Sequence, residues 1–314
     1  MCMSEFTRKL KSFAADRPAL WNTVKKAQEW KYAFDYQTYY GRFSTAKAST
    51  TEINLEFCSN CNLRCSFCAL DHTKPKTYMS LDVLDRLFTQ LLEDDRFSQV
   101  QTINLHNGGE TLMHPDRVEM FKRIRRFKDI YQEMGREFPA IILLTNGMLL
   151  RPKLAEEIIS LKVLDEIGFS LDGGSPTAFE ELRVNAKWEK FAENVRAVVD
   201  IKNRVDPMMK TFGISIIPKP HPLNNTWMEK DFKAITELLD SVEYRRLHDW
   251  GGQVDIGEEK IVNKKGCDML MRQMVVLPNG DVTVCCNDLN SKGVVGNILK
   301  DDLYGIYKGE PRMH

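Results

Sequence analysis

The stretch CNLRCSFC, residues 61–68, places three cysteines close together, with three residues between the first two and two between the last pair. Thiolates are soft ligands that suit zinc, copper and iron–sulfur clusters. Spacing alone leaves three interpretations open: a four-iron cluster held by three cysteines, a zinc ion completed by His72 or Cys58, and cysteines without metal. A cluster held by only three cysteines keeps one iron open for another molecule. The three cysteines are Cys61, Cys65 and Cys68.

A strand is predicted directly before these cysteines, at TEINLEF (residues 51–57). From there strands and helices alternate about six times up to residue 250, which predicts an α/β fold of parallel strands joined by right-handed crossovers, open or curled into a barrel. Chemistry in such folds gathers at the carboxyl ends of the strands. The later strands are predicted at 100–106, 140–146, 166–172, 211–218 and 244–248, and the helices at 80–95, 115–134, 151–161, 188–203 and 228–242.

The chain is divided into three predicted parts. Residues 1–50 form a helical, aromatic-rich N-terminal extension, residues 51–255 the alternating α/β domain, and residues 256–314 a small C-terminal domain. In the last part Asn279-Gly280 lies between two apolar runs and predicts a β-hairpin. Cys267 precedes this hairpin, and Cys285 and Cys286 end its second strand.

Composition excludes several classes of partner. The 314 residues contain 44 Lys plus Arg and 44 Asp plus Glu, so the formal charge is zero and no nucleic-acid or membrane partner is expected. The N-terminus lacks the apolar core of a signal peptide, and we expect a cytoplasmic protein. Eight cysteines in a reducing compartment favour metal ligands or catalytic thiols over disulfides.

Three further motifs follow the predicted strands after the cysteine loop. GGETLMHP (108–115) follows the second strand, TNG (145–147) the third and SLDG (170–173) the fourth. Together with the cysteine triad and its aromatic Phe67, this ordered set resembles the radical S-adenosylmethionine enzymes over about residues 50 to 250. The resemblance implies a partial (β/α)6 barrel, and a four-iron cluster on Cys61, Cys65 and Cys68 whose open iron binds S-adenosylmethionine.

The resemblance also implies a reaction and a set of contacts. Reduction by a donor such as flavodoxin or ferredoxin cleaves S-adenosylmethionine to a 5′-deoxyadenosyl radical. One departure from the family is Thr111, which stands where proline usually follows GGE. The implied cofactor contacts are Gly108, Gly109 and Glu110 near the ammonium group, Ser170 and Asp172 near the ribose, Arg183 near the carboxylate, Phe67 near the adenine, and Asn146 as a further polar contact.

The C-terminal cysteines resemble part of a known auxiliary domain. Cys267, Gly280 and Cys285 follow the C-x12-G-x4-C start of the SPASM domain, or of its shorter relative called twitch, although no cysteine follows Cys286. The resemblance implies a second iron–sulfur cluster on Cys267 and Cys285. Neighbouring residues of a strand face opposite sides, so Cys286 is a candidate hydrogen-atom donor, with Cys58 as its rival.

The substrate is less sharply defined by the sequence. No strand-rich module that binds a leader peptide is predicted in residues 1–50, which favours a sugar or cyclitol over a peptide, with epimerisation or oxidation as outcome. HDWGG (248–252) is either a carbohydrate-binding corner or a packed glycine turn. The alternatives are a peptide-modifying maturase, a non-catalytic zinc-stabilised binding protein, and a radical-enzyme fold that has lost catalysis.

Overall fold

The fold is organised around one large sheet. The computed structural model describes residues 18–43, 48–255, 267 and 269–313. Its strands are β1 Glu52–Leu55, β2 Arg64–Cys65, β3 Thr102–Asn104, β4 Ala140–Thr145, β5 Glu166–Ser170, β6 Arg183–Val184, β7 Lys210–Ile216, β8 Ser241–Arg245, β9 Gln273–Val276, β10 Asp281–Thr283 and β11 Val294–Asn297. A nine-stranded sheet has the order β11-β10-β9-β1-β3-β4-β5-β7-β8, and β2 pairs with β6 separately. Neighbouring strands from β9 through β8 are parallel, and the edges of the sheet are β11 and β8.

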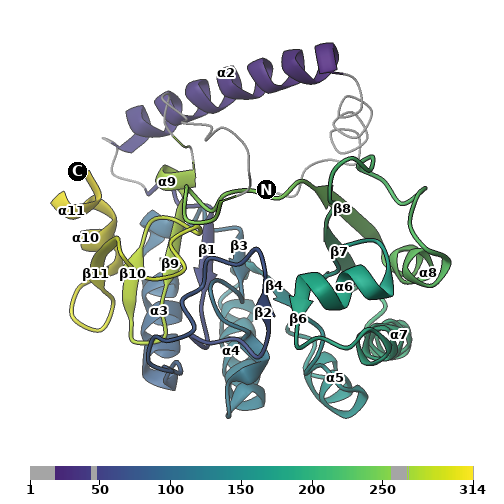
Figure 1. Cartoon of the computed structure of the whole chain (residues 1–314). Helices are drawn as coiled ribbons and strands as arrows, with labels where there is room; N and C mark the ends of the chain where they lie inside the picture. Colours follow the sequence, from purple (N-terminus) through teal and green to yellow (C-terminus); the bar gives the residue numbers. More distant parts are fainter. Residues whose placement is uncertain (1–17, 44–47, 256–266, 268, 314) are drawn as a thin grey trace.

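Helices follow the parallel strands and form the layer behind the sheet (Figure 1). Consecutive crossover helices touch one another, as α3 touches α4 and α5 touches α7. Ser80 caps α3 as predicted, because its hydroxyl accepts the Val83 N–H. The helices are α2 Pro18–Phe43, α3 Leu81–Glu93, α4 Arg117–Glu133, α5 Pro152–Ile159, α6 Pro176–Leu182, α7 Trp188–Val205, α8 Lys230–Leu238, α9 Met269–Arg272, α10 Leu303–Lys308 and α11 Glu310–Met313, with 3-10 turns η1 Asp95–Phe97 and η2 Thr111–Met113.

The predicted alternation of strands and helices is confirmed, with one error in position. The sixth strand begins at Ser241, three residues before the predicted Tyr244, and the preceding helix ends at Leu238. Asp240 explains the early end of the helix. Its Oδ2 accepts hydrogen bonds from the backbone N–H of Thr211 at 2.7 Å and from the Lys202 ammonium at 2.9 Å. These bonds hold Asp240 against the neighbouring strand, so the helix ends before its helical sequence pattern does.

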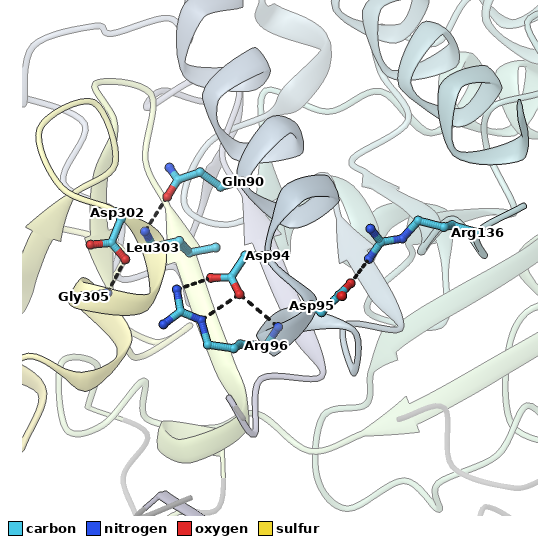
Figure 2. Close-up of polar contacts among 8 residues, drawn as sticks. All are labelled: Gln90, Asp94, Asp95, Arg96, Arg136, Asp302, Leu303 and Gly305. Carbon is cyan, nitrogen blue, oxygen red and sulfur yellow. Dashed lines mark hydrogen bonds and ion pairs between the residues drawn. The ribbon is translucent and has the colours of Figure 1, made fainter. Parts of the chain in front are cut away.

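The C-terminal hairpin joins the main sheet. The predicted strands are β9 and β10, and β9 pairs in parallel with β1, with Glu52 opposite Gln273. Helix α10 packs against the end of α3, where Gln90 accepts a hydrogen bond from the Leu303 N–H and Asp302 caps the helix through Gly305 (Figure 2). The C-terminal strands therefore extend the barrel sheet, while the boundary at residue 256 stays a prediction.

The N-terminal extension is helical, as predicted, where the structure describes it. Helix α2 lies across the top of the view beside α9 (Figure 1). Trp30 and Phe34, one turn apart, are 70% and 72% exposed. Among the described residues, no helix combines the length and the apolar character needed to cross a membrane.

Candidate functional site

The cysteine loop leaves the carboxyl end of β1 and is held in place by a second, two-stranded sheet. Cys65 lies in β2, opposite Arg183 of β6, and the Ser66 N–H donates to the Leu182 carbonyl at 3.0 Å. The segment after β5 therefore fixes the middle of the loop. Cys61, Cys65 and Cys68 are all half-buried free thiols.

Each cysteine of the triad has an N–H group within reach of its sulfur. Asn146 Nδ2 lies 3.6 Å from Cys61 Sγ, and Arg183 Nη1 lies 3.8 Å from Cys65 Sγ. The backbone N–H of Leu70 points at Cys68 Sγ from 3.5 Å. Such donors stabilise negative charge on a thiolate that ligates metal.

These three thiols fit an iron–sulfur cluster by their chemistry. Burial raises the pKa of Cys61 to about 12 and also raises the pKa values of Cys65 and Cys68, so a soft cation is needed to hold them as thiolates. Across the described residues, no three His, Cys, Asp or Glu side chains converge on one metal ion. This holds for Cys61, Cys65 and Cys68 with or without His72, so this geometry does not choose between an iron–sulfur cluster and a zinc ion.

Glu110 of the GGE motif binds the neighbouring TNG motif. Its Oε1 accepts the Thr145 hydroxyl at 2.8 Å, and its Oε2 accepts the Asn146 N–H at 2.9 Å. The residue is only 4% exposed. Burial raises the pKa of Glu110, although these hydrogen bonds act to lower it. The observed role of this carboxylate is to orient Asn146 beside Cys61, and the predicted ammonium contact stays a prediction. Thr111, the departure from proline, donates to the Leu105 carbonyl at 2.6 Å.

The two glycines of GGE meet protein atoms on the cysteine side. A Cβ at Gly109 would lie 1.8 Å from the Cys58 carbonyl oxygen, so only glycine lets these two backbone segments approach. At Gly108 the nearest atoms would be 3.1 Å away, on Glu56 and Leu289. In the structure, glycine is needed at position 109 because the Cys58 backbone approaches it closely. The prediction instead attributed the two glycines to contact with the cofactor.

Asp172 and Arg183 form a buried ion pair. Asp172 Oδ2 accepts from Arg183 Nε and Nη2, both at 2.7 Å, and its Oδ1 accepts the Ile216 N–H at 2.6 Å. The pair connects the SLDG motif, the cysteine loop and β7. The Arg183 guanidinium also lies 5.9 Å from the Phe67 ring centroid. Ser170 ends β5 and is half-buried, and its predicted ribose contact stays a prediction.

Sequence analysis missed the polar residues on the inner face of the sheet, opposite the helices. Asn104 Nδ2 donates to Glu52 Oε1 at 2.8 Å and to Asn54 Oδ1 at 3.0 Å, while Gln273 Nε2 donates to Glu52 Oε1 at 2.6 Å. We call these four residues the inner network. Their positions alternate with fully buried Ile53 and Ile103. A polar residue at every second strand position was the signal available in the sequence.

Two titratable residues extend this face towards the motifs. Glu56, 2% exposed, follows β1, and its Oε2 accepts the Gly108 N–H at 2.7 Å and Asn107 Nδ2 at 3.0 Å. Burial raises the pKa of Glu56. His106 follows β3, and its Nδ1 is buried without a hydrogen-bond partner among the described residues. Burial, followed by the charge of Arg245, lowers the pKa of His106 to about 4.

The C-terminal cysteines differ from the prediction in one respect. Strand β10 ends at Thr283, so Cys285 and Cys286 lie in a turn beyond it, and the argument that they face opposite sides of a strand is wrong. Cys267 is exposed, and residues 256–266 and 268 lie outside the described part. Burial, followed by the charges of Cys285 and Glu52, raises the pKa of Cys286 to about 12.

Cys58, the rival donor, is enclosed in the cysteine loop. Its thiol donates to Asn60 Oδ1 at 3.1 Å, and the residue is 1% exposed. Burial raises its pKa to about 11. Its role as a hydrogen donor stays a prediction.

The HDWGG corner is a glycine turn packed on the cysteine loop. Gly252 N–H donates to the Asp249 carbonyl at 3.0 Å, and Gly251 and Gly252 have φ values of 70° and 86°. Trp250 Nε1 donates to the Phe67 carbonyl at 2.8 Å. These contacts match the packed-turn alternative and use the indole N–H that a bound sugar would otherwise take.

Comparisons with known proteins agree with this geometry. The profile of the Radical SAM superfamily matches residues 55–219, and that of an iron–sulfur cluster-binding domain, SPASM, matches residues 267–314. A cofactor-modifying protein for tungsten-containing aldehyde ferredoxin oxidoreductase from Pyrococcus furiosus is 28% identical over 165 residues. That match covers 52% of this chain and 42% of the relative, so the chain spans less than half of that protein's length.

Two solved structures resemble the fold. BtrN in complex with AdoMet and 2-DOIA has a TM-score of 0.54 and 19% identity, covering 84% of each chain. Streptococcus suis SuiB bound to precursor peptide SuiA has a TM-score of 0.64 and 14% identity, covering 84% of this chain and 65% of SuiB. At these identities the likeness concerns the fold alone.

Proposed function

The chain belongs to the radical S-adenosylmethionine superfamily, and from this premise we propose that it abstracts a hydrogen atom from a carbon of a sugar or cyclitol. The superfamily's cofactors are a four-iron cluster and S-adenosylmethionine, which supply the 5′-deoxyadenosyl radical when they are bound. Cys61, Cys65 and Cys68 are the residues that would hold the cluster. Asn146 and Arg183 direct N–H groups at two of their sulfurs.

The inner network is the observation that carries the choice of substrate. Three carboxamides and one carboxylate gather on β9, β1 and β3, on the face opposite the helices. Amide groups donate to and accept from hydroxyl groups, a carboxylate accepts from them, and a polyol offers many hydroxyl groups. Gln273 Oε1 and Thr283 Oγ1 are buried there without partners among the described residues, so acceptors remain for a hydroxyl group.

Two outcomes at the substrate carbon remain distinct. Epimerisation returns a hydrogen atom to the substrate radical and needs a donor with an S–H group. Oxidation would instead remove one electron and one proton from it, and a second iron–sulfur cluster of the SPASM type is the candidate electron acceptor. After epimerisation the thiyl radical of the donor would regain one electron and one proton with the help of the external reductant. The Cys58 thiol is buried and already donates to Asn60 Oδ1, whereas Cys286 is only partly buried. We therefore assign the donor role, where one is needed, to Cys286.

The test uses anaerobically reconstituted full-length protein with dithionite as reductant. Formation of 5′-deoxyadenosine is measured alone and with a panel of aldoses, amino sugars and cyclitols. The proposal expects one polyol to increase 5′-deoxyadenosine and, when deuterated, to transfer deuterium into it. Stimulation by a peptide substrate alone would establish the maturase alternative and overturn the carbohydrate assignment. Absence of 5′-deoxyadenosine under every condition would overturn radical catalysis.

A further inference from the structure

The four residues after the C-terminal cysteines, 287–290, lie directly on the cysteine loop. The carboxamide of Asn290 makes two hydrogen bonds with that loop. Its Oδ1 accepts the Asp71 N–H, and its Nδ2 donates to the Ala69 carbonyl, both at 2.8 Å. One side chain thus holds the backbone directly after Cys68 in both directions, across more than 200 residues of sequence.

Lys74 adds a charged contact to the same surface. Its ammonium donates to the Leu289 carbonyl at 2.7 Å. Its charge also favours the ionised form of Glu56, although burial raises the pKa of that carboxyl group overall. Glu56 in turn binds the Gly108 N–H at 2.7 Å. Lys74 therefore holds the C-terminal segment against the chain that follows the cysteine loop.

The Leu289 carbonyl also packs against the GGE motif itself. A Cβ at Gly108 would lie 3.1 Å from the Leu289 carbonyl oxygen and 3.2 Å from Leu70 Cδ1. Leu289 is 2% exposed, so its side chain is anchored in the core. At the other end of the segment, Gln253 Nε2 donates to the Asn287 carbonyl at 2.8 Å. Residues 287–290 are consequently fixed at both ends.

We propose that residues 287–290 act as a latch that positions the cysteine-loop exit and the GGE motif for S-adenosylmethionine, with Asn290 and Lys74 as positioning residues. This inference rests on the proposed function, because it concerns the same cofactor site. Cys286 lies directly before the latch. Binding of an iron–sulfur cluster at the C-terminal cysteines and binding of S-adenosylmethionine therefore become coupled. Such coupling is reciprocal: each binding event changes the affinity of the other by the same factor.

The test measures dithionite-driven 5′-deoxyadenosine formation without substrate, as a function of S-adenosylmethionine concentration. Asn290→Ala removes both hydrogen bonds to the cysteine loop and a longer one, 3.5 Å, to Gln253 Oε1. We expect KM for S-adenosylmethionine to rise about 10-fold while kcat and iron content stay near those of the wild type. Asn290→Asp keeps the acceptor for the Asp71 N–H, so we expect its KM for S-adenosylmethionine to lie between those of the wild type and Asn290→Ala. Lys74→Met is expected to raise KM, and Lys74→Arg to restore most of the loss.

Asn287→Ala is the matched control, because Asn287 contributes only its backbone carbonyl to the latch, and the substitution removes a carboxamide while keeping that contact. The Asn287 side chain makes none of the hydrogen bonds found among the described residues, so its KM should equal that of the wild type. Equal KM values for Asn290→Ala and wild type would overturn the latch. So would a loss of iron and kcat at unchanged KM, because that result marks a purely structural role.

Hydrogen exchange separates failure of the latch from failure of the proposed function. If the wild type forms no 5′-deoxyadenosine, radical catalysis is rejected, and the latch is judged by binding alone. S-adenosylmethionine should then slow amide exchange in residues 69–74 of the wild type, and slow it less in Asn290→Ala. Equal protection in the two proteins would overturn the latch independently of catalysis.

Discussion

The two cysteine regions of this molecule are built in different ways. The first, Cys61 to Cys68, follows a central strand, and Asn146 from the segment after β4 and Arg183 of β6 lie near its sulfurs. The second, at Cys285 and Cys286, lies in a turn after a short strand close to the sheet edge, and Cys267 is exposed. Its clearest tertiary contacts come from the latch that follows it.

The difference shows how much of each site the sheet itself prepares. Parallel strands bring their carboxyl ends to one edge, so motifs that are far apart in sequence meet at the first cysteine region. The second region depends on a docked segment. We expect changes in the first region to abolish function and changes in the second to modulate it.

The largest effect is expected from the cysteines themselves. A variant with Cys61, Cys65 and Cys68 all changed to Ala should lose about four irons per chain and all 5′-deoxyadenosine formation. Cys285→Ala should lose up to about four irons and keep dithionite-driven cleavage of S-adenosylmethionine. Iron, sulfide and 5′-deoxyadenosine assays check both. Equal loss of cleavage in the two variants would erase the contrast between the regions.

The second prediction concerns the contact between GGE and the cysteine loop. Gly109→Ala places a Cβ 1.8 Å from the Cys58 carbonyl, and backbone must move to relieve that overlap. We expect a destabilisation of about 3 kcal/mol or more, with loss of the cluster. Gly108→Ala meets its neighbours at 3.1 Å and should cost about 1 kcal/mol. Urea unfolding and iron content compare the two, and similar values would contradict the geometry.

The third prediction tests the ion pair behind Cys65. Asp172→Asn leaves the Arg183 guanidinium buried without its counter-charge, and we expect a loss of about 3 to 5 kcal/mol in the free energy of unfolding. Glu156→Gln at the exposed pair with Arg204 is the control and should change stability by less than about 1 kcal/mol. Chemical denaturation measures both. A small effect at Asp172 would mean that the pair does not support the loop.

The smallest effect is expected from His106. Its pKa is about 4 in the folded chain, below the unfolded value, so the unfolded chain binds more protons between these values. Stability therefore falls as pH drops through about 6.5 towards 4. When the pH is lowered from 7.5 to 5.5, the free energy of unfolding of the wild type should fall by about 1 kcal/mol more than that of His106→Gln. Unfolding at the two pH values checks this, and parallel losses would place His106 in a solvated site.

Much of the fold and part of the site were predictable from the sequence. Each of the six predicted strands exists, and the GGE, TNG and SLDG motifs follow β3, β4 and β5 as expected. The shift at β8 arose because Asp240 bonds to Thr211, a contact 29 residues away in sequence. Asn290 escaped notice for the same reason, since a lone Asn carries no periodic signal, whereas Glu56 continues the alternation of Glu52 and Asn54 along the first strand.

The sequence by itself determined the order of the elements, the cysteine motif and the family, because apolar periodicity and motif spacing are local properties of the chain. The tertiary structure alone decided which groups surround them. It placed β9 beside β1, Arg183 beside Cys65, and residues 287–290 on the loop after Cys68. These contacts join segments about 120 to 220 residues apart, and they depend on how the sheet brings distant strand ends together.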